Sequence, residues 1–384
     1  MASLSWEVNC DGVVTSAGRV DEAQIGHIPP QGDRTFSLPV PVPDKGKCFL
    51  KLYYHRKAPS ELVPEGYLLG FDEWPLVNDD GRNQHAAALL AGPAVGGGPL
   101  KAADGGDFLI ISNERISYVY SKRTGLFSRM SCGGQSFLTR PMEVNVWRAP
   151  TDNDRKVKLD WMAAHYDKSV VRAYHTDWRA ADGAVKLSSV LSVSAVAVQR
   201  FLDIRAEWTV YPDGTVDLSM EAERDPEFPE LPRFGLRLFL PGELDQVRYY
   251  GYGPHESYVD KHRASSHGVY AAPVSRLHED YIRPQENGSH FDCDYVEVKG
   301  SGAGLTAVSA APFCFSASPY TQEELAEKAH NYELVPCGET VLCLDYAQNG
   351  IGSESCGPRL LPRYRLDGER FQFQIRLIPA VDGN

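Results

Sequence analysis

Apolar and polar residues alternate with a period of two along much of the chain, the pattern of half-buried β strands. The clearest case runs through 202–210, turns at Pro212-Asp213-Gly214 and returns through 216–222. A second hairpin is expected over 116–130, with its turn at 122–125. The 34 Gly and 26 Pro residues stand mostly between short apolar stretches, where they favour turns. The pattern therefore predicts an all-β protein.

Helical patterns are scarce. The segment 321–329 begins with Thr321 and Glu324, a capping box in which the Thr hydroxyl and the Glu carboxylate satisfy each other's free backbone N–H. A weaker helical pattern covers about 159–165. The sequence thus predicts two short helices among many strands.

The spacing of turn residues divides the chain into two domains and a linker. Residues 1–91 predict a small β-sandwich, which opens on what resembles an interior strand and is expected to lack its first strands. Residues 92–106 are rich in Gly, Pro and Ala and are expected to be a linker. Residues 107–384 are expected to form a large antiparallel assembly of two sheets packed face to face.

Composition and charge exclude several classes of protein. The net charge of −12 has the wrong sign for binding phosphate backbones, so we expect no nucleic-acid partner. The longest apolar stretch is short and interrupted by Gly92 and Pro93, so no membrane partner is expected either. No signal peptide is expected from the first residues, and the eight Cys form no CxxC pair. These features predict reduced thiols and a cytoplasmic location.

The segment 147–155 places charged and amide side chains directly after an apolar strand. Arg148, Asp152, Asn153 and Asp154 could hydrogen-bond sugar hydroxyls or take part in acid–base chemistry. The alternative is a turn in which Asp and Asn bond their own backbone.

Two further segments combine titratable residues with loop signals. Residues 249–258 hold four tyrosines beside His255 and Glu256, which suits sugar stacking and proton transfer but also core tyrosines at a sheet corner. Residues 283–290 hold Glu286 and His290, which could bind a polyol or form a plain polar turn.

A long polar and glycine-rich run, 344–359, separates two apolar strands and is expected to be a functional loop. Cys356 in this loop is expected close to solvent, as a contact residue rather than a nucleophile, because no basic residue lies beside it in the sequence. No nucleophile elbow, phosphate-binding loop, HExxH motif or dinucleotide fingerprint occurs in the sequence.

Taken in order along the chain, these motifs resemble the C-terminal region of the long β-galactosidases of glycoside hydrolase family 2. The matching segments are 147–154, 250–258, 284–288, 315–321, 344–346, 350–358 and 361–362. Residues 3–78 resemble the immunoglobulin-like domain that precedes this region in the family. The resemblance covers nearly the whole chain.

The resemblance implies a galactose mutarotase-like supersandwich that completes the aglycone side of the active-site mouth. It implies that the Arg148–Asp154 segment is a mobile loop near that mouth, and that Ser355 and Cys356 face the aglycone. Some members carry Trp where Cys356 stands, and the smaller Cys offers a narrower stacking face. The expected substrates are β-D-galactosides such as lactose.

The catalytic glutamates of this retaining family lie on a TIM barrel that precedes the matching region. The resemblance therefore implies no catalytic residue in this chain and no activity when it is alone. Magnesium and sodium are expected for the full-length enzyme, with none held by this chain. Its expected partners are the missing N-terminal and barrel domains and a galactoside, and the full-length enzyme is expected to be a homo-oligomer.

Two alternatives remain open at the level of sequence. The large domain could itself be an aldose mutarotase or epimerase, with His255 or His290 as the acid and Glu256 or Glu286 as the base. It could also be a carbohydrate-binding or assembly module that docks on a separate barrel subunit.

Overall fold

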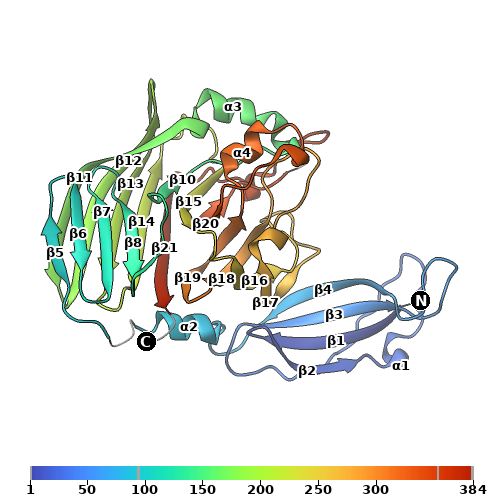
Figure 1. The fold of residues 1–384 in the computed structure, drawn as a ribbon. Helices are drawn as coiled ribbons and strands as arrows, with labels where there is room; N and C mark the ends of the chain where they lie inside the picture. Colours follow the sequence, from blue (N-terminus) through green and yellow to red (C-terminus); the bar gives the residue numbers. More distant parts are fainter. Residues whose placement is uncertain (1, 93–95, 353, 382–384) are drawn as a thin grey trace. The chain divides into compact units, whose positions relative to one another are not determined.

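The computed structural model describes residues 2–92, 96–352 and 354–381. Within these residues the chain forms 21 strands and four short α helices, so the all-β prediction is confirmed (Figure 1). The chain divides into two compact units, of which the first comprises residues 1–88 with 266–269. The second comprises residues 89–265 with 270–384.

The first unit is built on one antiparallel sheet of four strands in the order β2-β1-β3-β4. These strands are β1 (Ala2–Cys10), β2 (Val13–Arg19), β3 (Cys48–Arg56) and β4 (Leu68–Leu76). The short helix α1 (Glu22–Ile25) follows β2, and α2 (Gln84–Leu90) follows β4. A small β-sandwich was expected here, and the described residues of this unit form a single sheet.

Two cysteines of the first unit are bonded to each other. Cys10 and Cys48 lie directly opposite in the antiparallel register of β1 and β3, and they form a disulfide. The prediction of reduced thiols is therefore wrong for this pair, while Cys132, Cys314, Cys337, Cys343 and Cys356 are free thiols. The sequence carries no signal for the pairing, because the cysteines are 38 residues apart and meet only through the register.

A buried lysine organises one face of the first sheet. The ammonium group of Lys51 lies 3.9 Å from a carboxylate oxygen of Glu7 and 3.7 Å from one of Glu73. The same ammonium donates to Ser266 Oγ at 2.9 Å, and His267 Nδ1 lies 2.7 Å from Glu73 Oε1. These contacts explain why residues 266–269 belong to this unit, because buried charges require partners.

The second unit contains a small sheet of five strands in chain order. It comprises β5 (Lys101–Asp104), β6 (Phe108–Ser112), β7 (Ile116–Ser121), β8 (Leu126–Cys132) and β9 (Gln135–Ser136). Strand β5 lies within 92–106, the segment expected to be a linker, and pairs with β6. Residues 93–95 of that segment lie outside the described part of the chain.

A second sheet of twelve strands forms the larger layer. Its strands are β10 (Glu143–Asn145), β11 (Ser169–Ala181), β12 (Ala184–Ala195), β13 (Val198–Val210), β14 (Val216–Arg224), β15 (Arg233–Pro241), β16 (Gln246–Gly253), β17 (Ser266–Pro273), β18 (Ser289–Gly300), β19 (Ala303–Ser318), β20 (Glu339–Gln348) and β21 (Arg370–Val381). Its main order is β10-β15-β20-β19-β21-β14-β13-β12-β11, and β18, β16 and β17 branch from β19. Strand β21 therefore joins the half that contains β15, β18, β19 and β20 to the half formed by β11–β14.

The two sheets of the second unit pack face to face. Phe127 on β8 contacts Trp208 on β13 edge-to-face, with 5.0 Å between ring centroids. The buried hydroxyls of Tyr118 and Tyr120 on β7 find partners on the large sheet, at Gly214 O (2.7 Å) and Ser189 Oγ (2.8 Å). Aromatic rings thus fill the space between the layers while every polar atom named here is hydrogen-bonded.

The local predictions made from the alternating pattern are confirmed. Strands β13 and β14 pair from Leu202 with Arg224 to Val210 with Val216, and β7 and β8 form the second hairpin. Helix α4 (Gln322–Glu327) begins at Thr321, whose hydroxyl accepts from the Glu324 amide at 3.1 Å. Helix α3 (Val157–Ala163) begins two residues before the weaker predicted helix.

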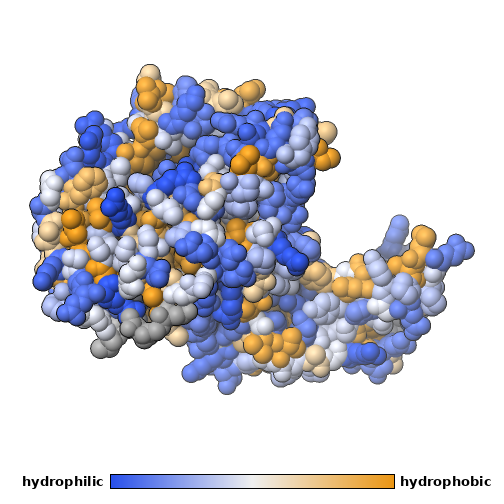
Figure 2. Space-filling model, viewed as in Figure 1, coloured by the Kyte–Doolittle hydropathy of each residue, from blue (hydrophilic) through white to orange (hydrophobic). Residues whose placement is uncertain are grey.

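Hydrophilic residues predominate on the face of the second unit that Figure 2 shows, with hydrophobic residues scattered among them.

Side chains of β6 alternate between the two faces of the small sheet. Phe108 and Ile110 are 45% and 42% exposed, whereas Leu109 and Ile111 are fully buried. The small sheet therefore has one buried and one solvated face, as the period of two requires.

Candidate functional site

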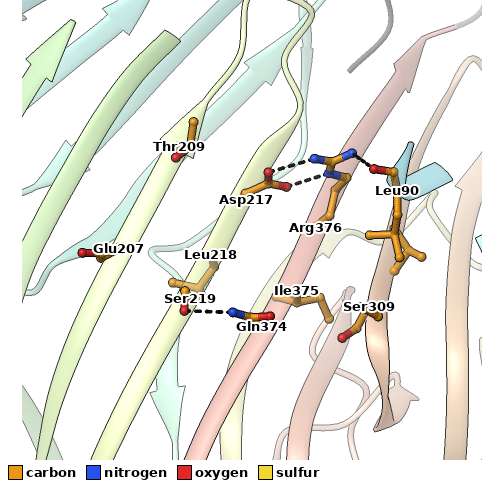
Figure 3. A pocket seen from close by; sticks show the side chains of 12 residues that line it. Leu90, Glu207, Thr209, Asp217, Leu218, Ser219, Ser309, Gln374, Ile375 and Arg376 are labelled. Carbon is orange, nitrogen blue, oxygen red and sulfur yellow. Dashed lines mark hydrogen bonds and ion pairs between the residues drawn. The ribbon is translucent and has the colours of Figure 1, made fainter. Parts of the chain in front are cut away.

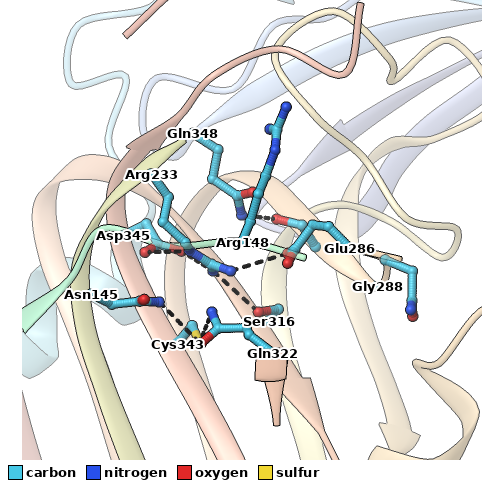
Figure 4. A network of polar contacts seen from close by, with 12 residues as sticks. Asn145, Arg148, Arg233, Glu286, Gly288, Ser316, Gln322, Cys343, Asp345 and Gln348 are labelled. Atoms are coloured by element: carbon cyan, nitrogen blue, oxygen red, sulfur yellow. Dashed lines mark hydrogen bonds and ion pairs between the residues drawn. The ribbon is translucent and has the colours of Figure 1, made fainter. Parts of the chain in front are cut away.

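A buried ion network connects two central strands of the large sheet to a loop. Arg233 on β15 forms a two-point contact with Asp345 on β20, and its Nη1 lies 3.1 Å from Glu286 Oε1 (Figure 4). All three side chains are at least 96% buried, with side-chain exposures of 1%, 0% and 4%. The ion pair between Arg233 and Glu286 ties the loop that carries Glu286 to strand β15, and breaking a buried pair of this kind is costly.

Close approach of the two strands depends on Gly235. A Cβ atom at this position would lie 2.1 Å from the carbonyl oxygen of Leu344 and 2.5 Å from Cα of Asp345. Only glycine leaves room there, so β15 and β20 come together where Arg233 meets Asp345.

Arg148 and Asp154, two of the predicted substrate-binding residues, are buried and bind each other. Arg148 Nη2 lies 2.7 Å from Asp154 Oδ1, and Arg148 also donates to the carbonyl oxygens of Asn349 and Gly350. Asp154 Oδ2 accepts from the backbone N–H of Thr151 at 2.9 Å. The pair therefore shapes the loop from within, and its predicted contact with substrate stays a prediction.

The loop 151–156 is tied to the loop 349–356, about 200 residues further along the chain. Asn153 Nδ2 donates to Gly352 O at 2.6 Å, and Arg155 Nη2 donates to Ser355 O at 3.0 Å. The Asp260 carboxylate accepts from the amides of Ile351 (2.9 Å) and Gly352 (2.8 Å). Several hydrogen bonds to backbone groups thus hold the second loop, which carries Ser355 and the exposed Cys356.

A pocket of about 420 Å³ lies between these loops and the loop that carries Glu286. It brings together Asp152, Asn153, Glu256 and Glu286, four of the predicted residues from three separate segments. Its lining is predominantly polar and consists of Thr151, Asp152, Asn153, Glu256, Tyr258, Asp260, Lys261, Tyr281, Gln285, Glu286, Ile351 and Gly352. We take this pocket, defined by these residues, as the candidate functional site.

Three side chains on one wall of the pocket bind one another. Glu256 Oε1 accepts from Tyr281 Oη at 2.5 Å and from Lys261 Nζ, and Lys261 Nζ lies 3.1 Å from Tyr281 Oη. Glu256 Oε2 accepts from the Gly288 amide at 2.9 Å. Both oxygens of Glu256 are thereby engaged, so this wall is fixed before any ligand arrives.

The electrostatics of the pocket follow from burial. Burial raises the pKa of the Glu286 carboxyl, and the neighbouring Arg233 and Arg148 guanidinium groups oppose that rise. Burial also raises the pKa of Tyr281, and its hydrogen bond to Glu256 acts in the same direction. Tyr281 therefore stays protonated near neutral pH and acts as a hydrogen-bond donor.

The two histidines considered as acids lie elsewhere. His255 is exposed, and His290 is buried between the rings of Tyr249 and Phe315 at 4.3 and 5.1 Å. Neither residue lines the pocket. Among the described residues, the geometry does not join either histidine to Glu256 or Glu286 at this site.

Burial lowers the pKa of His290 to about 4. Below about pH 6.5 the unfolded chain binds a proton at this histidine, whereas the folded chain does not. The contribution of His290 to the free energy of unfolding is therefore fully present above pH 6.5 and is lost as the pH falls towards 4. We expect His290→Gln to remove roughly 3 kcal/mol of this pH dependence, measured by urea unfolding between pH 4.5 and 7. The matched variant His255→Gln should keep the wild-type slope, and an unchanged slope in His290→Gln would contradict the prediction.

Another hollow lies on the outer face of the large sheet, over β13, β14 and β21 (Figure 3). Arg376 binds Asp217 through two contacts of 2.6 and 2.8 Å and donates to Leu90 O at 3.0 Å. Gln374 donates to Ser219 at 3.5 Å. These side chains satisfy one another, as on an ordinary solvated sheet face, so we do not place the site there.

Sequence reasoning did not identify several residues of the site. Tyr258 and Gln285 lie inside the segments 249–258 and 283–290, which the sequence had singled out. Asp260 and Lys261 follow shortly after the first of these segments, so their closeness to it could have indicated them. Asp345 also stands inside a motif already singled out, 344–359, but Arg233 gave no such signal, because it lies on a strand and meets Asp345 only through a pairing 112 residues apart.

The described residues contain no group of three or more His, Cys, Asp or Glu side chains that could hold a metal ion. The magnesium and sodium ions expected for the full-length enzyme stay a prediction. In the same part of the chain, no helix is long and apolar enough to cross a membrane.

Comparison with known proteins shows which family the chain resembles. Residues 112–377 match the family model for the β-galactosidase small chain, and residues 2–77 match that for β-galactosidase domain 4. The β-galactosidase of Actinobacillus pleuropneumoniae is 35% identical over 98% of this chain, which covers 36% of that protein. The β-galactosidase of Staphylococcus xylosus is also 35% identical, over 68% of this chain and 26% of its own length.

The chain thus spans 36% and 26% of the lengths of these two relatives. Among solved structures, galactose 1-epimerase from Lactobacillus acidophilus aligns with a TM-score of 0.41 and 10% identity, covering 75% of this chain and 99% of the epimerase. This likeness is too low to assign a function.

Proposed function

Because this chain belongs to the β-galactosidase small-chain family, we propose that it forms the aglycone side of the active site of a retaining β-galactosidase of glycoside hydrolase family 2. In this proposal the catalytic carboxylates come from the remaining part of the enzyme. The loops 151–156 and 349–356 contribute hydrogen-bonding groups for the leaving sugar of a β-D-galactoside such as lactose. The chain alone does not hydrolyse galactosides.

The observation that carries the proposal is the joining of these two loops. Asn153 and Asp260 bind the backbone at Gly352, so segments distant in sequence form one wall beside the pocket. The wall presents hydroxyl, amide and carboxylate groups, which suit the alternating donors and acceptors of a sugar.

The state of the pocket carboxylates supports placing the chemistry elsewhere. Retaining hydrolysis uses two carboxyl groups about 5 Å apart, one as nucleophile and one as acid. Here Glu256 accepts hydrogen bonds at both oxygens, and Glu286 is bound to the buried Arg233. These contacts give both carboxylates a structural part in the pocket wall, and in this proposal the chain positions substrate.

A chimera tests the proposal. The matched C-terminal region of the A. pleuropneumoniae relative is replaced by this chain, and hydrolysis of a chromogenic β-galactoside is measured. We expect an active chimera, and a truncated relative at least about 100-fold less active because its substrate is mispositioned. The isolated chain is the second control and should show no activity.

Two results would contradict the proposal. Full activity of the truncated relative would show that this region is not needed, and hydrolysis by the isolated chain would show that it holds its own catalytic groups. A chimera carrying Asn153→Ala separates the role of the loop contact from folding: we expect a raised KM for galactosides with a large aglycone and an unchanged melting temperature.

A further inference from the structure

The backbone of segment 349–352, where the loop after β20 begins, is held from two sides by opposite charges. Arg148 donates to the first two carbonyl oxygens of this segment. The Asp260 carboxylate accepts from the amides of Ile351 at 2.9 Å and Gly352 at 2.8 Å, one at each oxygen. A cation thus meets the carbonyl groups and an anion meets the N–H groups, which makes all of these hydrogen bonds charge-assisted.

The peptide group between Gly350 and Ile351 is bound at both of its ends. Its carbonyl oxygen accepts from Arg148 Nη2 at 3.0 Å, and its N–H donates to Asp260 Oδ1 at 2.9 Å. The C=O and N–H of a trans peptide point in opposite directions, so the two charged side chains lie on either side of the backbone. Turning this peptide group would break both hydrogen bonds, and its orientation is therefore fixed before any ligand arrives.

Gly350 permits this close approach. A Cβ atom at position 350 would lie 2.8 Å from both Cγ and Oδ2 of Asp260. A contact this short forces one of the two groups to move. Any other residue at position 350 would therefore push the segment away from the carboxylate that holds it.

Asp260 stands on a turn that is itself fixed. Tyr258 and Lys261 exchange two backbone hydrogen bonds, of 2.8 and 3.0 Å, so Asp260 lies in the middle of a tight turn. Just before this turn, the fully buried Ser257 donates its N–H to the carbonyl oxygen of Ser289 on β18 at 2.7 Å. The carboxylate is therefore carried by a segment anchored on the large sheet.

We propose that Asp260 is a positioning residue: its carboxylate sets the path of segment 349–352 and, through it, the place of Ser355 and Cys356 further along the same loop. The effect on substrate rests on the proposed function, whereas the hold on the backbone does not. A sugar aglycone needs several hydrogen bonds in fixed places, while a flat aryl aglycone is bound mainly through its apolar area. Asp260 thus favours sugar over aryl aglycones.

Hydrogen exchange of the Ile351 and Gly352 amides, followed by NMR in the full chain, tests the hold on the backbone. Asp260→Asn keeps the shape of the side chain but removes its charge and one acceptor oxygen. Both amides should exchange at least about tenfold faster in this variant.

Asp225→Asn is the matched control. Asp225 is also half-buried and accepts a backbone amide, from Glu227 at 2.9 Å, but it does not line the pocket. This variant should leave the exchange of the Ile351 and Gly352 amides at the wild-type rate. If Asp260→Asn does not fold, Gly350→Ala displaces the segment from the same carboxylate and should speed the exchange of the same two amides.

The chimera described above tests the effect on substrate. In the chimera, Asp260→Asn should raise KM for lactose about fivefold or more, while KM for a nitrophenyl galactoside changes less than twofold. A general loss of structure would change both substrates alike, so the difference between them distinguishes positioning from folding.

Two results would overturn the proposal. The Ile351 and Gly352 amides could exchange in Asp260→Asn as in wild type, or KM could rise equally for lactose and for the aryl galactoside. An inactive wild-type chimera would contradict the proposed function and with it the effect on substrate. The exchange rates would then still decide whether Asp260 holds the segment, because they are measured on the chain alone.

Discussion

Asp345→Ala is expected to lower the free energy of unfolding of the second unit by about 3–5 kcal/mol. Asp345 is fully buried and forms a two-point contact with Arg233, whose side chain is 1% exposed. Removing the carboxylate takes away both hydrogen bonds that Asp345 accepts and leaves the buried guanidinium with Glu286 Oε1 at 3.1 Å and Ser316 Oγ at 3.3 Å. Breaking a buried ion pair by removing one partner is strongly destabilising. Urea unfolding followed by tryptophan fluorescence measures the loss.

An exposed ion pair in the same sheet supplies the control. Arg370 and Glu223 lie 2.9 Å apart with side-chain exposures of 77% and 61%. Glu223→Ala should cost at most about 1 kcal/mol, because water screens exposed pairs. If Asp345→Ala and Glu223→Ala lower the free energy of unfolding equally, the buried network does not stabilise the second unit more than an exposed ion pair does.

Trp208→Ala is expected to cost about 3–5 kcal/mol, because it creates a large cavity between the two sheets. Trp208 is fully buried, packs edge-to-face on Phe127 at 5.0 Å, and donates from Nε1 to Gly125 O at 3.1 Å. The substitution removes both the ring contacts and a hydrogen bond, and leaves the Gly125 carbonyl without that donor. The midpoint of urea unfolding should fall accordingly.

Trp178 on β11 is the matched control for this prediction. It is half-buried, and its Nε1 donates to the Asp104 carboxylate at 3.1 Å. Trp178→Ala should lose less than half as much stability, because water can fill the space that the ring leaves. Equal losses from the two variants would mean that packing between the sheets does not dominate the stability of this unit.

Local features of the fold could be predicted from the sequence. The hairpin of β13 and β14 follows from strict alternation on either side of Pro212-Asp213-Gly214, and α4 follows from the Thr321 cap. Both depend on residues close together in the chain, where the period of the pattern and the turn chemistry act directly.

Contacts that depend on strand register could not be predicted in this way. Cys10 and Cys48 are bonded because β1 and β3 pair at those positions, and Arg233 meets Asp345 for the same kind of reason. The loop motifs did indicate the neighbourhood of Asp152, Glu256 and Glu286. They could not indicate that Arg148 and Asp154 turn inward, because charged loop residues are usually solvated.

The position of β21 has a consequence for how the chain folds. Strands β11–β14 can pair with their sequence neighbours early, and β19 can begin pairing with β18. Union of the two halves of the large sheet requires β21, which pairs with β14 on one side and β19 on the other. Such distant pairings slow folding, so a partly folded chain would expose two unpaired sheet edges until β21 inserts. During synthesis this interval is when the chain is most exposed to aggregation and to capture by chaperones.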